Sequence, residues 1–473
     1  MPQEKTHHSA SIYLGSKFLI KGLSFLLIPV WTSAFSPEEY GIIGTLVALA
    51  GVVMPIVMLG LPTALVRLKV DCGDSSEWQS LVASVSFALL VSGIVFVFGG
   101  MLFGSALWKY IPSGDIPFFP YVPILILSIF LGFFSRLGLA IHQASKSAKR
   151  ASIYEQTLSL GSVCFALIFV LGFGMGVRGY FFGALVGGLL CLILFLFEFR
   201  SYFSFSYLSK AKIKNALSYG LPMVPHALSA WILNLSDRIM LNDMAGLKEV
   251  GIYSLAANFG ALLSMVAVSL NQAIFPGYLQ VRRAGGTAER NAQGVLKGSL
   301  ILSLMAVIIL GVGPPVLFLM VNERFLEALP LLPPVLGGFF FFGLGLLFRS
   351  PLLFAKRTGT VALITLGGAL VNVLGNLYFI PIFGSQGAAW MTLGSYGVTF
   401  LIVLLISRKL DPMSISLRAL GMMIGAPFLM VIFTWLYPDL DVVNLSLRTV
   451  MTVCIAVFFV VYFRRLNRPV SVS

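Results

Sequence analysis

Long apolar runs separated by short polar segments fill nearly the whole chain, and this alternation is its main structural signal. Most runs reach the ~20 residues that a helix needs to cross about 30 Å of hydrocarbon, whereas a barrel strand needs only about 10. Helices also satisfy their backbone hydrogen bonds within one segment, so the pattern predicts an all-α polytopic membrane protein. About fourteen transmembrane helices are expected, at residues 11–34, 41–66, 81–104, 118–143, 152–173, 179–199, 214–236, 250–274, 297–321, 330–354, 359–381, 386–407, 416–437 and 446–463.

Two short strings recur at nearly the same displacement and indicate an internal duplication. Residues 39–42 read Glu-Tyr-Gly-Ile and residues 249–252 read Glu-Val-Gly-Ile, and a similar echo links residues 176–179 with 384–387. The displacement contains six predicted helices, an even number, so both copies enter the membrane from the same side as parallel repeats. The expected organisation is an N-terminal six-helix lobe at 1–200, a cytoplasmic inter-lobe linker at 201–214, a C-terminal six-helix lobe at 215–409, and a two-helix hairpin with a basic cytoplasmic tail at 410–473.

Composition and charge agree with a membrane location. Hydrophobic residues make up 58% of the chain and charged residues only 11%, far from the balance of a soluble domain. Most of the 32 Lys and Arg residues fall in alternate loops, so the positive-inside rule predicts that both termini are cytoplasmic. The same bias explains most of the net charge of +14 by attraction to anionic inner-leaflet lipid, and we expect no nucleic-acid partner.

Enzyme chemistry has little support in the sequence. The connections on the outward side are short, and there is no HExxH, Walker-type glycine loop, paired-cysteine metal site or GxSxG elbow. We therefore expect no catalytic residue, no metal and no cofactor. A membrane transporter is the favoured class, with a membrane enzyme of glycan assembly as the alternative from another class.

Four basic residues inside or at the ends of apolar runs are the candidate substrate-binding groups, because a charge there costs about 2.5–3.5 kcal/mol on insertion scales. Lys17 and Lys21 are four residues apart on one predicted helix, which puts them on one face about 6 Å apart along the axis. Arg136 lies in the fourth predicted helix and Arg349 occupies a similar place in the tenth. Together they predict a cationic cavity for a phosphate or pyrophosphate. Snorkelling, a structural ion pair or an end-of-helix anchor is the alternative for each.

Three further groups are candidates for coupling transport to an ion. His226 lies among prolines in the seventh predicted helix, where it is equally compatible with a structural histidine. Glu155 begins the fifth predicted helix, where the helix dipole alone would favour a carboxylate. Asp237 closes the seventh and is followed by a basic residue, so a structural ion pair or cap is the favoured alternative there.

The segments 36–41, 234–241, 250–256 and 272–276 resemble bacterial polysaccharide flippases of the multidrug/oligosaccharidyl-lipid/polysaccharide exporter superfamily. The resemblance covers the first twelve predicted helices. It implies alternating access between two lobes and the flipping of an undecaprenyl-pyrophosphate-linked oligosaccharide, an O-antigen, capsule or exopolysaccharide unit, to the periplasmic leaflet of the bacterial inner membrane. Glycan polymerase machinery is an expected protein partner.

Two observations leave the subclass open. Fourteen helices exceed the twelve common among polysaccharide flippases and are closer to the related peptidoglycan-precursor flippases. A multidrug and toxin extrusion antiporter of the same superfamily is the alternative transporter; its cationic ligands call for an embedded acidic site, whereas the deep charges here are largely basic.

Overall fold

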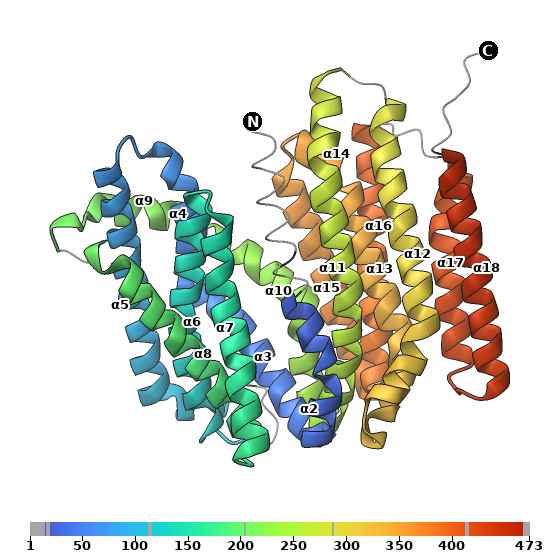
Figure 1. Ribbon diagram of the computed structural model, residues 1–473, viewed down its shortest axis with the longest axis horizontal. Coiled ribbons are helices and arrows are strands. Elements are labelled where there is room, and N and C mark those ends of the chain that lie inside the picture. The colour runs from blue at the N-terminus through green and yellow to red at the C-terminus, as the bar shows by residue number, and fades with distance from the viewer. Residues whose placement is uncertain are drawn as a thin grey trace. The chain divides into compact units, whose positions relative to one another are not determined.

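The computed structural model describes residue 15 and residues 19–111, 116–202, 205–285, 288–411 and 416–466. These residues are almost entirely helical and contain no strand, which confirms the predicted all-α class (Figure 1). The first unit contains α2 (Ile28–Ala34), α3 (Pro37–Met58), α4 (Leu61–Leu68), α5 (Ser75–Trp108), α6 (Tyr121–Ala144), α7 (Ala148–Leu167), α8 (Gly176–Phe199), α9 (Lys210–Gly220) and α10 (Met223–Met244). The chain continues through α11 (Leu247–Arg283), α12 (Ala288–Met320), α13 (Leu332–Phe348), α14 (Ser350–Phe354), α15 (Thr358–Phe383), α16 (Ser385–Leu410), α17 (Leu417–Leu436) and α18 (Val442–Leu466).

Twelve helical segments in the described part of the chain are long and apolar enough to cross a membrane. They correspond to the second to sixth and the eighth to fourteenth of the predicted helices. Of the remaining two predicted segments, 11–34 lies partly outside the described residues, and its described part is helical from Leu19 to Ala34 apart from a turn at Leu27. Residues 214–236 are divided between α9 and α10. The division falls at Pro222, which lacks a backbone N–H and so interrupts the helical ladder.

The chain forms two compact units, Met1–Gly251 and Ile252–Ser473. In the first, α6, α7 and α8 pack on one another, α5 lies against α6, and α10 packs on α3. In the second, α13 packs against α16, while α12 lies against α13, α17 and α18. The lobe boundaries drawn from the sequence repeat stay a prediction; in the structure α9 and α10 pack on helices of the first unit.

The first repeated string begins a helix with two reciprocal backbone hydrogen bonds. Ser36 precedes α3, and its Oγ accepts a hydrogen bond from Glu39 N at 3.2 Å, while Ser36 N donates to Glu39 Oε2 at 2.9 Å. Pro37 occupies the first turn, where a missing N–H costs nothing. This capping box fixes the residue at which α3 enters the bundle.

The glycines of the two repeated strings face each other across a close backbone contact. A Cβ at Gly41 would collide with the carbonyl of Leu247, and a Cβ at Gly251 would collide with the carbonyl of Pro37. Glycine is therefore needed in both copies, because only a residue without a side chain lets the first turns of α3 and α11 approach so closely. The repeated glycines have a packing role.

Buried polar contacts fix other helix pairs. In the first unit Trp231 Nε1 donates to Ala48 O at 2.8 Å and ties α10 to α3. In the second unit the Tyr253 hydroxyl lies 2.8 Å from Thr392 Oγ1. Arg448 of α18 is fully buried and donates to the carbonyls of Thr434 and Tyr437 at the end of α17. In that position it satisfies carbonyls that a helix end leaves without intrahelical partners.

Candidate functional site

A cavity of about 610 Å³, with a mostly apolar lining that includes two charged residues, opens in the first unit where α3, α4 and α6 meet the end of α9 and the start of α10. Two of its lining residues are arginines, Arg67 of α4 and Arg136 of α6. The other lining residues are Pro55, Met58, Gly60, Pro62, Thr63, Val66, Leu139, Ala140, Gln143, Tyr219, Met223, Val224 and Ala227. We call this space the Arg67–Arg136 cavity.

Helix α6 directs Arg136 into the cavity by burying its sequence neighbours on other faces. Ser135 and Leu137 are buried, and Ser135 Oγ donates to Tyr154 O at 3.0 Å, which sets the rotation of α6 against α7. Consecutive residues are turned by about 100° around a helix, so Arg136 is exposed. It makes no hydrogen bond or ion pair with another described residue, and its five donors are available to a ligand.

Arg67 reaches the cavity from α4, a short helix that follows a two-residue turn. Leu59 and Gly60 both have positive φ, 52° and 65°, and a Cβ at Gly60 would collide with backbone atoms of Gly220. Glycine therefore permits the turn and also the close contact of α4 with α9. The contact of α4 with α9 positions the last turn of α4, which carries Arg67, at the cavity.

The Arg67 guanidinium has one acidic neighbour. Its Nη1 lies 3.2 Å from Asp71 Oδ1, with half of each side chain exposed. An exposed pair of this kind contributes only about 0–1 kcal/mol, so an anionic ligand can share or replace the carboxylate.

A few residues on, Asp74 caps α5 by accepting the Glu77 N–H at 2.7 Å, and this hydrogen bond lowers the pKa of Asp74 below its ordinary value.

The other predicted cationic residues are not among those that line the cavity. Lys21 is exposed on the N-terminal helical segment, and Lys17 lies outside the described residues. Arg349 caps α13 in the second unit, where it is half-buried and its Nε has no hydrogen-bond partner among the described residues. Their assignment to one binding site with Arg136 stays a prediction.

The predicted coupling residues lie in three different settings. His226 is exposed on α10, one position before the cavity residue Ala227. Glu155 is half-buried on α7. Asp237 is buried, and its Oδ1 lies 3.4 Å from Arg238 Nη1, which is the geometry of a structural ion pair. A coupling role for these residues stays a prediction.

The structure also contains two clusters that the sequence analysis missed, each built on one carboxylate. Glu198, near the end of α8, accepts the Tyr154 hydroxyl at 2.9 Å and lies 3.1 Å from His142 Nε2. Asp411, which follows α16, accepts the Tyr278 hydroxyl at 2.6 Å and lies 3.6 Å from Arg282 Nη1. Each cluster ties together helices of its own unit. The partners in each cluster are far apart in sequence, so no short sequence motif predicts that they meet.

Comparison with known proteins assigns the family. The model of the polysaccharide biosynthesis protein family matches residues 7–280, more than half of the chain, and the chain belongs to this family. It is 24% identical over 415 residues to the succinoglycan biosynthesis transport protein ExoT of Rhizobium meliloti, a match covering 82% of this chain and 80% of the relative. The resemblance inferred from the sequence motifs is confirmed.

Two solved structures share the fold. The lipid II flippase MurJ in its inward closed conformation matches with a TM-score of 0.73 at 16% identity, over 98% of this chain and 99% of that one. An inward-facing multidrug resistance transporter of the MATE family, in the MOP superfamily, matches with a TM-score of 0.67 at 17% identity, over 86% and 100% of the two chains. The protein is therefore a multi-pass membrane protein of polysaccharide biosynthesis with a fold found among transporters.

Proposed function

We propose that the protein flips a polyprenyl-pyrophosphate-linked oligosaccharide from the cytoplasmic to the periplasmic leaflet of the bacterial inner membrane. The observation that carries the proposal is the Arg67–Arg136 cavity, in which two arginines line one space of about 610 Å³. Planar guanidinium groups match the oxygens of a phosphate in paired hydrogen bonds. The lipid tail would stay in the membrane while the pyrophosphate occupies this cavity.

The side from which the substrate enters follows from the predicted topology. Arg67 and Gln143 lie beside the connections after α4 and after α6, which the positive-inside rule assigns to the cytoplasm. The same rule places both termini there. We infer that the described cavity receives the pyrophosphate from the inner leaflet, where lipid-linked units are assembled.

Transfer to the other leaflet requires the cavity to change the side to which it opens. The internal repeat supplies the two halves that alternating access needs, and α10, which the repeat assigns to the second half, contributes Met223, Val224 and Ala227 to the cavity wall. Movement of α10 relative to α6 would therefore alter the cavity directly. His226 is the coupling candidate best placed to sense it, being exposed one position before Ala227.

A cation antiporter of the multidrug type is the second candidate, favoured by the shared fold at a TM-score of 0.67. A cation site needs an acidic group directed at the ligand, and the described residues that line the cavity include two arginines and no carboxylate. The charge of the cavity therefore supports an anionic substrate. An enzyme of glycan assembly is a third candidate, and its loss would leave the translocation of the lipid-linked unit normal.

The test is to measure which leaflet holds the lipid-linked unit in cells that lack the protein. We expect units to accumulate on the cytoplasmic face, and wild-type protein to restore their periplasmic exposure. Arg136→Gln should restore it poorly at equal protein level, whereas Arg178→Gln, at an exposed arginine outside the cavity, should restore it fully. Normal translocation in the absence of the protein would contradict a flippase and support an enzyme.

A further inference from the structure

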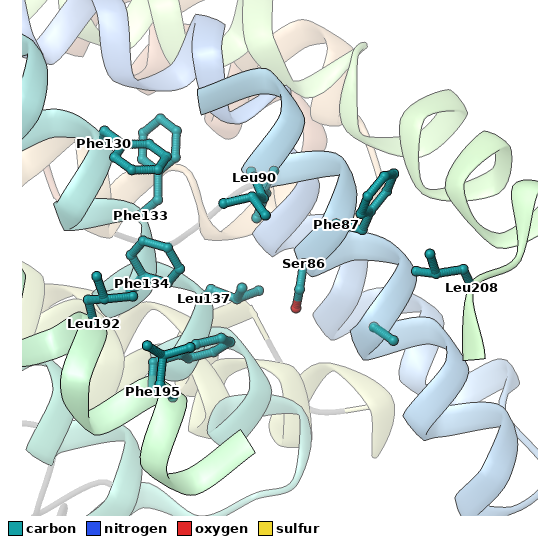
Figure 2. Close-up of a pocket in the computed structure, with 13 residues that line it drawn as sticks. Ser86, Phe87, Leu90, Phe130, Phe133, Phe134, Leu137, Leu192, Phe195 and Leu208 are labelled. Atoms are coloured by element: carbon teal, nitrogen blue, oxygen red, sulfur yellow. The ribbon is translucent and has the colours of Figure 1, made fainter. Parts of the chain in front are cut away.

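A second cavity in the first unit has the opposite character from the Arg67–Arg136 cavity. It holds about 360 Å³ between α5, α6 and α8, and residue Leu208 lies at its edge. Figure 2 shows Ser86 and Leu90 of α5 on one side and the aromatic side chains of α6 on the other. Among the thirteen lining residues only Ser86 is polar; the others are Ala83, Phe87, Leu89, Leu90, Phe130, Phe133, Phe134, Leu137, Leu192, Phe195, Leu196 and Leu208. We call this space the apolar slot.

The slot is open along one side and has a buried floor. Leu137 and Phe195 are 2% and 0% exposed, whereas the rim residues Phe87, Leu90 and Leu196 are 39%, 39% and 48% exposed. These rim residues lie on segments long and apolar enough to cross a membrane, where an exposed apolar surface is compatible with contact with hydrocarbon. The slot is therefore a recess that a membrane lipid can enter sideways.

Ring contacts hold the aromatic wall of the slot in place. Phe130 lies edge-on to Phe133 and Phe134, with ring centroids 6.1 and 5.9 Å apart, and Phe134 packs on Phe195 at 5.6 Å. Gly93 of α5 leaves the space that the Phe130 ring occupies, since a Cβ there would lie 2.7 Å from Phe130 Cε2. These contacts fix the shape of the wall, which lowers the entropic cost of filling the slot.

The slot lies toward one end of the helices that form it. Phe195 is four residues before the end of α8, or about 6 Å along the axis, and Leu137 is about 10 Å before the end of α6. These ends belong to the side that the positive-inside rule makes cytoplasmic. A lipid in the slot therefore belongs to the inner leaflet.

Two exposed basic residues follow residues of the slot closely along the chain. Ser209 N donates to Ser84 Oγ at 2.9 Å, and Lys212 Nζ donates to Glu77 O at 2.6 Å, so the chain from Leu208 into α9 is fixed along the first turns of α5. Lys210, which is exposed, follows the slot residue Leu208 by two residues, so these contacts hold it close to the slot. Arg200, also exposed, comes four residues after the rim residue Leu196.

The carboxylate of Glu77, on the first turn of α5, accepts the Gly73 N–H at 2.7 Å and keeps its negative charge. The exposed basic residues that follow the slot residues Leu208 and Leu196 are Lys210 and Arg200. An apolar recess that ends at exposed cations is complementary to a lipid with an anionic headgroup.

We propose that the apolar slot binds an acyl chain of an anionic inner-leaflet phospholipid, with its phosphate held near Lys210 and Arg200. A cavity of about 150 Å³ lined by similar side chains accommodates benzene, so 360 Å³ accepts a longer hydrocarbon segment. The slot and the Arg67–Arg136 cavity use different faces of α6, so the two sites can be occupied at once. The bound lipid would join α5, α6 and α8 to the start of α9.

Native mass spectrometry of the purified full-length protein tests the lipid, with dioleoyl phosphatidylglycerol and dioleoyl phosphatidylcholine as probes. We expect tighter retention of phosphatidylglycerol. Ser86→Phe fills the slot and should lower this retention about tenfold or more, because each buried methylene is worth about a fourfold factor. Val95→Phe, at an exposed position on the same helix outside the slot, should leave it unchanged.

Surface variants test the headgroup without disturbing the packing. Lys210→Gln and Arg200→Gln should each lower phosphatidylglycerol retention about fivefold, the factor equal to ~1 kcal/mol per basic residue at a membrane surface, and should leave phosphatidylcholine retention unchanged. Equal binding of the two lipids by wild type would overturn the proposal. Preferential retention of undecaprenyl phosphate over phosphatidylglycerol would also overturn it and assign the slot to a polyprenyl chain.

Discussion

Replacing Arg136 with glutamine should weaken the binding of a diphosphate about tenfold. A hydrogen bond to a charged group contributes roughly 1.5–3 kcal/mol, and the low end applies because Arg136 is exposed in an open cavity. About 1.5 kcal/mol corresponds to about a tenfold change in Kd. Arg67 remains in the variant, so binding should weaken but persist. The measurement is calorimetric titration of the purified protein with farnesyl diphosphate.

Three comparisons make this prediction specific. Arg136→Lys keeps the charge but loses the planar fork, so its Kd should lie between wild type and Arg136→Gln. Arg67→Gln should have a smaller effect than Arg136→Gln, because Arg67 already shares its charge with Asp71 at 3.2 Å. Arg178→Gln should bind as wild type does. Equal affinity in wild type and Arg136→Gln, or an equal loss in Arg178→Gln, would refute the role given to the cavity.

Three further predictions concern folding and stability, measured by the yield of folded protein or by thermal unfolding in detergent. Ser36→Ala removes the hydroxyl that accepts the Glu39 N–H and should destabilise the protein by about 1 kcal/mol; an unchanged Tm would argue against the capping box. Gly251→Val should sharply reduce the yield of folded protein, because the new side chain collides with the Pro37 carbonyl. Gly367→Ala, where a Cβ meets nothing within 4 Å, should be tolerated. Similar yields for the two variants would contradict the close contact at Gly251. Arg448→Met leaves the carbonyls of Thr434 and Tyr437 without their donor and should lower the free energy of unfolding by about 1–3 kcal/mol. Arg418→Met, at an exposed arginine, is the control. Equal Tm values for the two variants would count against the buried contact.

Much of the architecture could be predicted from the sequence because membrane insertion depends on local composition. Twelve of the fourteen predicted helices coincide with long apolar helices in the structure. One of the other two, residues 214–236, is divided in the structure at Pro222, between α9 and α10. A hydropathy window averages over such features and cannot place the break.

The candidate site was only partly predictable. Arg136 stood out because an arginine inside an apolar run is costly and rare. Arg67 did not, because a basic residue at the end of an apolar run is the ordinary mark of a cytoplasmic loop. It enters the cavity only because the turn at Leu59 and Gly60 directs α4 back toward α6 and α9.

The sequence by itself determined that this is a helical membrane protein, and it predicted an internal repeat, basic cytoplasmic loops and a few charges within apolar runs. It also supplied the motifs that mark its family. Only the tertiary structure decided that Arg136 and Arg67 share one cavity and that an apolar slot lies on another face of α6. The reason is geometric: which side chains meet depends on how each helix is rotated about its axis, and a change of about 100° per residue turns a neighbour to another face. Contacts between helices set that rotation, as the hydrogen bond from Ser135 of α6 to Tyr154 of α7 does for α6.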